Sequence, residues 1–358
     1  MRRTGILLLA GLVTAACGGD DDGSAGDGDG DGGPGDPDGG GCAELDWADV
    51  DVAFEDADIL TEAVTYCSDG LLIRGQVCRP KGDGPYPVVV YNHGGFSGLG
   101  VDAMTGNCVD SARAGWVWIG SSYRGEDGSE GEIEVCYGEV TDVLTMIDIA
   151  LAQPYADPDR VFMWGGSHGG CITTRALQRG APVHAAVDVF GPADMTTNYQ
   201  YWVDGIEDGS DFSAFYQELV DTLDTAVGGP PSEFPEAYEA RSPLLFVDDL
   251  PDDVPFLITQ GVLDPLVPPQ QSCALAAAIG AGVVEAYHLD GAQMEVTSAP
   301  AGCEGSGLTW TAGPRPVSTW PEDRYLVVYD ELDHSFNGDA GAAMLGDVIG
   351  FFTARTPP

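Results

Sequence analysis

Short runs of consecutive apolar residues recur along this chain, separated by stretches that are typical of helices. Strands in a sheet that is covered on both faces have such continuous apolar runs. Because the predicted strands alternate with helices, we expect an α/β fold with a mainly parallel sheet and right-handed crossovers. The predicted strands are 86–91, 116–121, 161–164, 185–190, 255–259 and 325–329. The predicted helices are 138–152, 168–179, 270–281 and 340–352.

Three regions depart from this alternation. Residues 62–79 predict two antiparallel strands that turn near Ser68-Asp69-Gly70. Residues 195–245 carry many aromatic side chains among acidic ones and predict a small helical cap, whereas 289–322 are rich in Gly, Pro and Ser and predict an inserted loop. We expect one folded domain over residues 42–358, with the cap and the loop as insertions.

The N-terminal part has a different composition. Arg2 and Arg3 precede a short apolar stretch, and the small residues Thr14-Ala15-Ala16 follow it. This arrangement predicts a secretory signal over residues 1–16, too short to span a bilayer permanently. Residues 18–41 contain 12 Gly and 8 Asp, so they cannot bury apolar area and predict a disordered tether.

Cys17 directly follows these small residues, and the arrangement resembles the lipobox of bacterial lipoproteins. The resemblance implies that the signal is cut before Cys17, that Cys17 carries the lipids, and that residues 17–41 link the anchor to the folded domain. Thr14 stands where a leucine is usual, so an ordinary secreted protein is the alternative. In both cases we expect an exported protein of the bacterial cell envelope, with membrane contact only through the anchor.

Eight cysteines remain beyond Cys17, and none forms a Cys-x-x-Cys pair. An even number of cysteines after an export signal predicts disulfides, whereas the spacing argues against a structural zinc site. The sequence does not determine the connectivity. We predict the pair Cys273–Cys303, which would fasten the 289–322 insertion, and we expect Cys171 to be packed or bridged rather than reactive.

The balance of charge excludes one class of partner. The chain has 14 Lys and Arg against 58 Asp and Glu, a formal net charge of −44. Such a surface repels nucleic acid and anionic lipid head groups, so we expect neither as a partner.

The apolar run 161–164 leads directly into Gly165-Gly166-Ser167-His168-Gly169. A strand followed by G-x-S-x-G has the form of a nucleophile elbow, a strained strand-to-helix turn that exposes the serine hydroxyl. Ser167 is therefore the candidate nucleophile. A serine hydroxyl needs a base, a carboxylate that orients the base, and amides for the developing oxyanion.

Candidates for these partners follow other predicted strands. Asp264, between strand 255–259 and helix 270–281, is the candidate acid, with a solvated turn aspartate as the alternative. His334, just past the last strand, is the candidate base. His288 competes because it is nearer to Asp264 in sequence, but it lies within a strand-like run. The chain order Ser, Asp, His is the order that α/β-hydrolases use.

The candidate oxyanion donors are backbone amides. Gly94 and Gly95 belong to a His-Gly-Gly turn after the first buried strand, and His168 is the residue after the nucleophile. His168 needs no side-chain role in this scheme. The mechanism requires no metal and no organic cofactor.

Together these motifs resemble the catalytic domain of the prolyl oligopeptidase family of serine peptidases, within the α/β-hydrolase fold. The matching pieces are His93-Gly94-Gly95-Phe96, Tyr123-Arg124-Gly125, Gly165-Gly166-Ser167-His168-Gly169-Gly170, Ser242-Pro243, Gly261-x-x-Asp264-x-x-Val267-Pro268 and Asp333-His334-x-Phe336. The resemblance covers roughly residues 60–352. It implies a serine hydrolase that cleaves small peptides or related esters and amides through an acyl-serine intermediate.

Two departures from the family pattern limit what the resemblance implies. We expect no β-propeller before the catalytic domain, and the interval from Asp264 to His334 is longer than usual. Arg124 is a candidate for binding a substrate carboxylate, with a structural ion pair as the alternative. Trp202 in the cap is a candidate substrate contact, with core packing as the alternative.

Two other functions fit the same residues. A secreted carboxylesterase, similar to dienelactone hydrolases, would use the same three catalytic side chains. A non-catalytic surface-binding lipoprotein would keep the fold without the reaction, but inactive relatives normally lose a catalytic residue, and all three candidates are present here.

Overall fold

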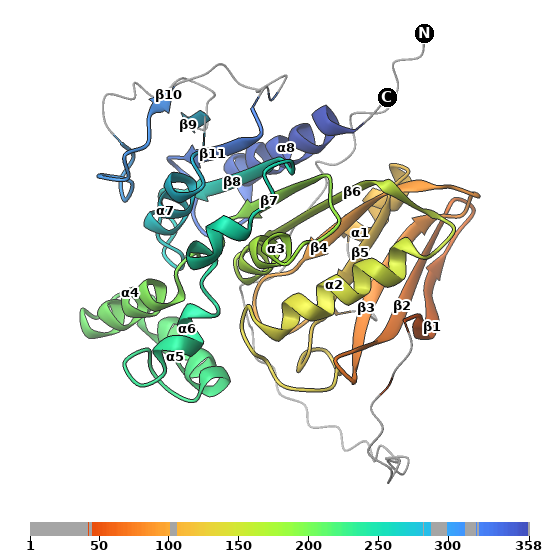
Figure 1. Cartoon of the computed structure of the whole chain (residues 1–358), viewed down its shortest axis with the longest axis horizontal. Coiled ribbons are helices and arrows are strands. Elements are labelled where there is room, and N and C mark those ends of the chain that lie inside the picture. Colours follow the sequence, from red (N-terminus) through yellow and green to blue (C-terminus); the bar gives the residue numbers. More distant parts are fainter. Residues whose placement is uncertain are drawn as a thin grey trace.

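One sheet of eleven strands runs through the described part of the chain (Figure 1). The computed structural model describes residues 42, 45–100, 106–281, 283–287, 299–311, 320 and 322–356. The strand order is β1-β2-β3-β5-β4-β6-β7-β8-β11-β9-β10. The strands are β1 (Trp47–Glu55), β2 (Ile59–Ser68), β3 (Leu71–Pro80), β4 (Tyr86–Asn92), β5 (Val117–Ser121), β6 (Ala156–Gly166), β7 (Ala185–Val189), β8 (Phe256–Gly261), β9 (Val283–Tyr287), β10 (Trp310–Thr311) and β11 (Arg324–Tyr329).

The sheet is antiparallel at one end and parallel over the rest. Strands β1, β2 and β3 pair antiparallel, and β3 also pairs antiparallel with β5. From β5 to β10 every pair of neighbouring strands is parallel. Asp69 (φ 52°) and Gly70 (φ 82°) close the two-residue loop between β2 and β3, as a tight hairpin turn requires. The mainly parallel sheet and this hairpin confirm the prediction from the apolar pattern.

Helices cover both faces of the sheet (Figure 1). The covering helices are α1 (Gly106–Arg113), α2 (Gly138–Leu151), α3 (His168–Gln178), α7 (Gln270–Ala278) and α8 (Gly338–Arg355). The segment predicted to form a cap contains α4 (Met195–Glu207), α5 (Ser213–Val227), α6 (Pro235–Glu239) and the 3-10 helix η1 (Pro243–Asp249). Helices α4, α5 and α6 lie together outside the sheet (Figure 1).

The alternation of side chains along each parallel strand divides the core in two. In β6, Val161 and Met163 join the cluster that includes side chains of α2, α3 and α7, whereas Phe162 and Trp164 join the cluster that includes α1 and α8. Successive residues of a strand point to opposite faces, so a strand buried on both sides is apolar throughout. This packing explains why the predicted strands appear as uninterrupted apolar runs.

Three strands differ from the prediction. Strand β10 lies within the segment 289–322, which the sequence predicts to be a loop, and it pairs with β9. Strand β6 begins at Ala156, earlier than the apolar run, because the pairing with β4 shifts register between Tyr86 and Val88 around a polar segment. The sequence pattern does not predict strand β1, because polar and apolar residues are mixed along it. It is an exposed edge strand, with Val50 and Val52 open to solvent. Its acidic residues Asp49, Asp51 and Glu55 are typical of an edge that avoids pairing with other chains.

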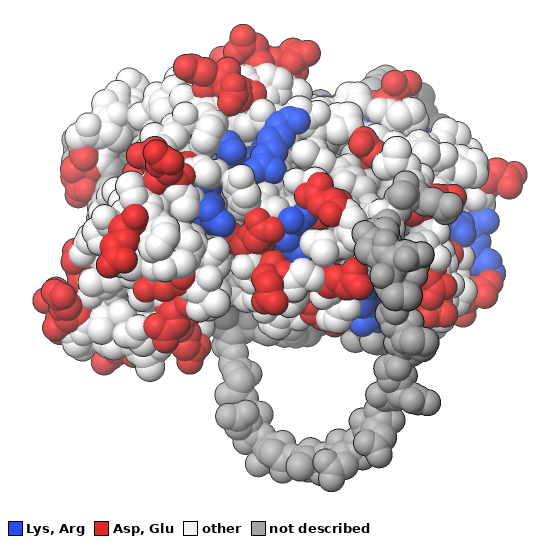
Figure 2. Space-filling model, turned by 60° about the horizontal axis from the view of Figure 1, so that its bottom comes forward, with Lys and Arg blue, Asp and Glu red and all other residues white. Residues whose placement is uncertain are grey.

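The surface is predominantly acidic, as the composition implies. Figure 2 shows acidic side chains spread over one face of the molecule, with basic side chains sparse between them. Within the described residues, none of the helices is both long and apolar enough to cross a bilayer.

Candidate active site

The candidate site lies where the order of the parallel strands reverses. From β4 the chain continues to β5 on one side, whereas β6, next in sequence, pairs on the other side of β4. Asn92 at the end of β4 is paired with Gly165 near the end of β6. In open α/β sheets, ligands bind beyond the carboxyl ends of strands at such a switch point. The His93-Gly94-Gly95 turn and Ser167 both emerge there.

Ser167 adopts a strained conformation between β6 and α3. Its φ of 58° and ψ of −124° lie outside the regions that non-glycine residues prefer. A side-chain carbon placed on Gly165 would lie 2.6 Å from the Asn92 carbonyl oxygen, and one on Gly169 would overlap the same carbonyl. Glycine at both positions is therefore required by the close approach of β4. Ser167 itself is partly exposed between buried neighbours.

Asp264 and His334 form a hydrogen-bonded pair. The His334 Nδ1 lies 2.7 Å from the Asp264 Oδ2, and the carboxylate is fully buried. The other carboxylate oxygen accepts backbone N–H bonds from Leu266 and Val267, both at 2.9 Å. With its carboxylate fixed in this way, Asp264 orients the imidazole. Because Nδ1 donates to Asp264, the neutral ring carries its lone pair on Nε2.

Two phenylalanines place His334 beside the serine turn. Phe190 packs against the His334 ring at 4.5 Å and against the Phe336 ring at 5.2 Å between centroids. A side-chain carbon on Gly166 would lie 2.6 Å from Phe336 and 3.3 Å from Phe190. Phe190 therefore contacts the ring of His334 and, together with Phe336, lies against Gly166, the residue before Ser167.

The glycine turn after β4 packs directly on the serine turn. A side-chain carbon on Gly94 would lie 2.8 Å from the Gly166 carbonyl oxygen and 3.2 Å from the Ser167 Cβ. Gly95 has a φ of +73°, which a glycine adopts without strain. The His93 ring stacks on Tyr123 at 4.0 Å, and its Nδ1 lies 3.2 Å from the Gly94 carbonyl oxygen. The turn that carries the predicted oxyanion donors Gly94 and Gly95 thus lies at the same end of the sheet as Ser167.

Arg124 has the structural role that the sequence left as the alternative to substrate binding. Its side chain is buried, and its guanidinium bonds Asp142 through Nε (3.0 Å) and Nη2 (2.8 Å). The same group reaches Glu134 at 2.8 Å and Asp69 at 3.0 Å. All three guanidinium nitrogens have carboxylate partners, so the side chain ties the β2–β3 turn to α2 and is not available to a substrate carboxylate.

Trp202 likewise packs rather than facing a substrate. Its side chain is 7% exposed, and its Nε1 donates to the Leu266 carbonyl oxygen at 2.8 Å. Tyr216, also buried, donates to the Pro265 carbonyl oxygen at 2.6 Å. These two bonds fasten the α4–α5 helices to the loop that presents Asp264. Aromatic patterning in the sequence does not distinguish such anchoring from substrate contact.

The eight cysteines beyond Cys17 are all joined in pairs. The pairs are Cys42–Cys67, Cys78–Cys108, Cys136–Cys171 and Cys273–Cys303. Each pair joins two cysteines that follow one another along the chain with no other cysteine between them. The predicted pair Cys273–Cys303 is among these pairs. His288, most of the 289–322 segment and residues 1–41 lie outside the described residues. No cluster of His, Cys, Asp or Glu suited to a metal ion occurs within the described ranges.

Comparison with known proteins shows a similarity to one family of peptidases. A family model described as the prolyl oligopeptidase family matches residues 118–290, a range that includes Ser167 and Asp264. The uncharacterized peptidase YtmA of Bacillus subtilis (strain 168) is 26% identical over 213 residues, which are 59% of this chain and 76% of that protein. The chain is a serine hydrolase, and its residues 118–290 resemble the prolyl oligopeptidase family. The prolyl oligopeptidase ophP of Omphalotus olearius is 29% identical over 150 residues, 38% of this chain but only 20% of that protein.

Solved structures share the α/β-hydrolase fold of this chain. The acylaminoacyl peptidase of Pyrococcus horikoshii superimposes with a TM-score of 0.58 at 19% identity, over 83% of this chain and 42% of that one. Acetyl xylan esterase 1 from Thermoanaerobacterium sp. superimposes with a TM-score of 0.57 at 15% identity, over 86% of this chain and 89% of that one. At these identities the likeness establishes the fold, which peptidases and esterases both use.

Burial of a site histidine predicts a pH dependence of stability. Burial lowers the pKa of His168 from its ordinary 6.5 to about 4. Between these two values the unfolded chain binds a proton at His168 that the folded protein does not, so stability falls as the pH falls. His168→Phe lacks this titrating group. Between pH 6.5 and pH 4, we therefore expect the unfolding free energy of the wild type to fall relative to that of His168→Phe by up to about 1.4 kcal/mol for each pH unit. Urea titrations at pH 7, 5.5 and 4.5 measure this difference, and a constant difference would contradict the prediction.

Proposed function

We propose that this protein is an exported serine hydrolase that cleaves peptide bonds, or related amide and ester bonds, through an acyl-serine intermediate. The observation that carries the proposal is the Asp264–His334 hydrogen bond beside the strained, partly exposed Ser167. In this scheme the buried carboxylate fixes the imidazole with its proton on Nδ1 and stabilises the imidazolium that forms during the reaction.

The reaction begins when the His334 Nε2 takes the proton of the Ser167 hydroxyl as that oxygen attacks the acyl carbonyl carbon. The carbonyl oxygen becomes an oxyanion, which accepts hydrogen bonds from the amide of Gly94 or Gly95 and from that of His168. His334 then gives its proton to the leaving amine or alcohol, leaving an acyl-serine. His334 then takes a proton from a water molecule as the water oxygen attacks this ester. His334 gives that proton to the departing Ser167 oxygen, which releases the acid and restores the free enzyme.

Peptides are the favoured substrate class, because the family model and the relatives by sequence are named as peptidases. The likeness to acetyl xylan esterases is one of fold. An esterase would use the same serine, histidine and aspartate, so only measured rates on the two bond types separate these alternatives. The acidic surface disfavours polyanionic substrates.

Export and lipid anchoring are part of the proposal. Four disulfides within the described residues support an oxidising compartment outside the cytoplasm. Cys17, after the secretory signal at residues 1–16, is the proposed site of lipidation, and residues 17–41 are the proposed tether.

A fluorophosphonate probe tests the nucleophile directly. We expect covalent labelling of the wild type and none of Ser167→Ala, because the probe requires an activated serine. Parallel assays with aryl esters and with peptidyl anilides then separate the two bond classes. Cleavage of both supports a peptidase, rapid ester turnover without amide cleavage supports the esterase, and an unlabelled wild type supports the binding protein.

Asp264→Asn tests the role of the buried carboxylate. The amide allows the opposite His334 tautomer and cannot stabilise the imidazolium, so we expect kcat to fall by roughly 10³- to 10⁴-fold. Asp333→Asn is a matched control, because Asp333 adjoins His334 in sequence but is exposed and bonds the Ser335 hydroxyl. Steady-state kinetics of the two variants should differ by at least 100-fold, and similar rates would exclude Asp264 as the acid of the triad.

Cys17→Ser tests the anchor. In a bacterial host fed a fatty-acid analogue, the wild type should incorporate the analogue and sediment with membranes. The variant should do neither while its domain is still exported with its disulfides formed. An unlabelled wild type in the soluble extracellular fraction would instead support the ordinary secreted protein.

A further inference from the structure

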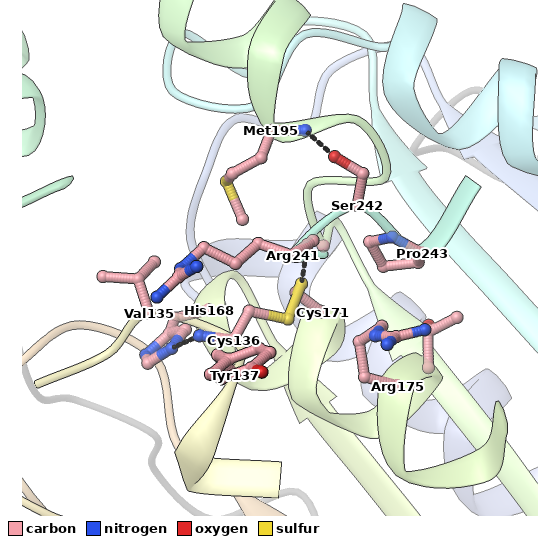
Figure 3. Close-up of a disulfide and its surroundings, with 12 residues drawn as sticks. Val135, Cys136, Tyr137, His168, Cys171, Arg175, Met195, Arg241, Ser242 and Pro243 are labelled. Carbon is pink, nitrogen blue, oxygen red and sulfur yellow. Dashed lines mark hydrogen bonds between the residues drawn. A yellow bond between two sulfur atoms is a disulfide. The ribbon is translucent and has the colours of Figure 1, made fainter. Parts of the chain in front are cut away.

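The side chain of His168 joins two backbone segments that are distant in sequence. Its Nε2 lies 2.9 Å from the backbone nitrogen of Cys136, and its Nδ1 lies 3.2 Å from the Gly95 carbonyl oxygen. A backbone N–H only donates and a carbonyl only accepts, so both bonds require a neutral ring with its proton on Nδ1. Figure 3 shows the ring reaching the Cys136 amide from the first turn of α3.

The Cys136 end of this connection is rigidly held. Val135 and Cys136 have φ values of 54° and 59°, so both residues occupy the left-handed region that non-glycine residues rarely adopt. The disulfide from Cys136 to Cys171 fastens the segment to α3 one turn after Ser167 (Figure 3). The buried Glu139 carboxylate also accepts the backbone N–H groups of residues 134, 135 and 137 at 2.7–3.0 Å.

The Gly95 end of the connection has less support from packing. A side-chain carbon placed on Gly95 would have no neighbour within 4 Å, although one on Gly94 would collide with the serine turn. The Phe96 ring packs on the His168 ring at 4.9 Å. The His168 hydrogen bond therefore restrains the Gly95 carbonyl, which shares one planar peptide with the Phe96 N–H. The Gly95 N–H lies on the other side of the same Cα, so the bond restrains it through the backbone torsions of Gly95.

We propose that the His168 side chain is a positioning residue that holds the oxyanion-binding turn in register with the His168 backbone amide. This inference rests on the proposed function, in which that amide and an amide of Gly94 or Gly95 receive the oxyanion. The ring connects the two donors through a rigid path that starts at the Cys136–Cys171 disulfide. Burial lowers the pKa of His168 to about 4, so the ring stays neutral and keeps the required tautomer at neutral pH.

A positioning role in the oxyanion site has a kinetic signature that a purely structural role lacks. The amides bond the charged oxygen more strongly in the transition state than the carbonyl in the bound substrate. Misplaced amides therefore lower kcat and leave KM nearly unchanged. Loss of an oxyanion donor costs roughly 10²- to 10³-fold in kcat, so loss of its positioning should cost less.

Three substitutions at one position test the role of each ring nitrogen. His168→Phe keeps the ring contacts and removes both hydrogen bonds, His168→Asn keeps a donor at the Nδ1 position, and His168→Gln keeps an acceptor at the Nε2 position. With active sites counted by fluorophosphonate titration, we expect kcat to fall by about ten- to a hundredfold in His168→Phe, with KM within about twofold. His168→Asn should recover most of that loss, and His168→Gln should not.

His184→Phe is the matched control. His184 also accepts a backbone N–H on its ring, from Val161 at 3.1 Å, but at the start of the buried part of β6 rather than at its catalytic end. The kcat of His184→Phe should equal that of the wild type.

Three results would overturn the inference. His168→Phe could keep the wild-type kcat per titrated site, its loss of activity could appear in KM, or His168→Gln could recover activity as well as His168→Asn does. A wild type that fluorophosphonate does not label overturns the proposed function itself, whereas a labelled, active wild type with an unaltered His168→Phe overturns this inference only.

Discussion

The close approach of two backbone segments at the ends of β4 and β6 determines most of this site. The Asn92 carbonyl lies where side chains at positions 165 and 169 would otherwise be, so only glycine allows the serine turn to pack there. At the same place Ser167 adopts its strained conformation, and the Gly94 backbone lies against the Ser167 Cβ. The nucleophile and the amides that would receive an oxyanion are therefore brought together by backbone packing, before any side chain is considered.

Side chains then orient the reactive groups in two separate layers. In the first, Asp264 holds His334, Phe190 packs on the imidazole, and Phe190 and Phe336 lie against the serine turn. In the second, buried histidine rings contact the carbonyls of the glycine turn. Both layers use neutral or fully paired polar groups in a water-poor environment, where hydrogen bonds keep donors and acceptors in fixed directions.

The rest of the molecule supplies rigidity around this site. Arg124 compensates the buried Asp142 and links it to two further carboxylates, so part of the excess negative charge is neutralised inside the domain. The cap helices are fastened to the Asp264 loop by Trp202 and Tyr216. Disulfides constrain neighbouring segments, and the Cys136–Cys171 bond lies one turn from Ser167. The site thus depends on elements that contribute nothing chemical to it.

Local patterns in the sequence were sufficient to predict the alternating fold, the hairpin around Asp69 and the serine turn. They also predicted that Asp264 and His334 follow their strands. These features are visible locally because continuous apolar runs and glycine-flanked turns follow from burial and backbone sterics. The tertiary structure alone decided which charged or aromatic residues face one another. Arg124 belongs to an ion-pair network, Trp202 to the attachment of the cap, and the His168 ring to the glycine turn, because their partners come from segments distant in sequence. Exposed strand β1 and the pairing of the cysteines depend in the same way on long-range neighbours, which no local periodicity encodes.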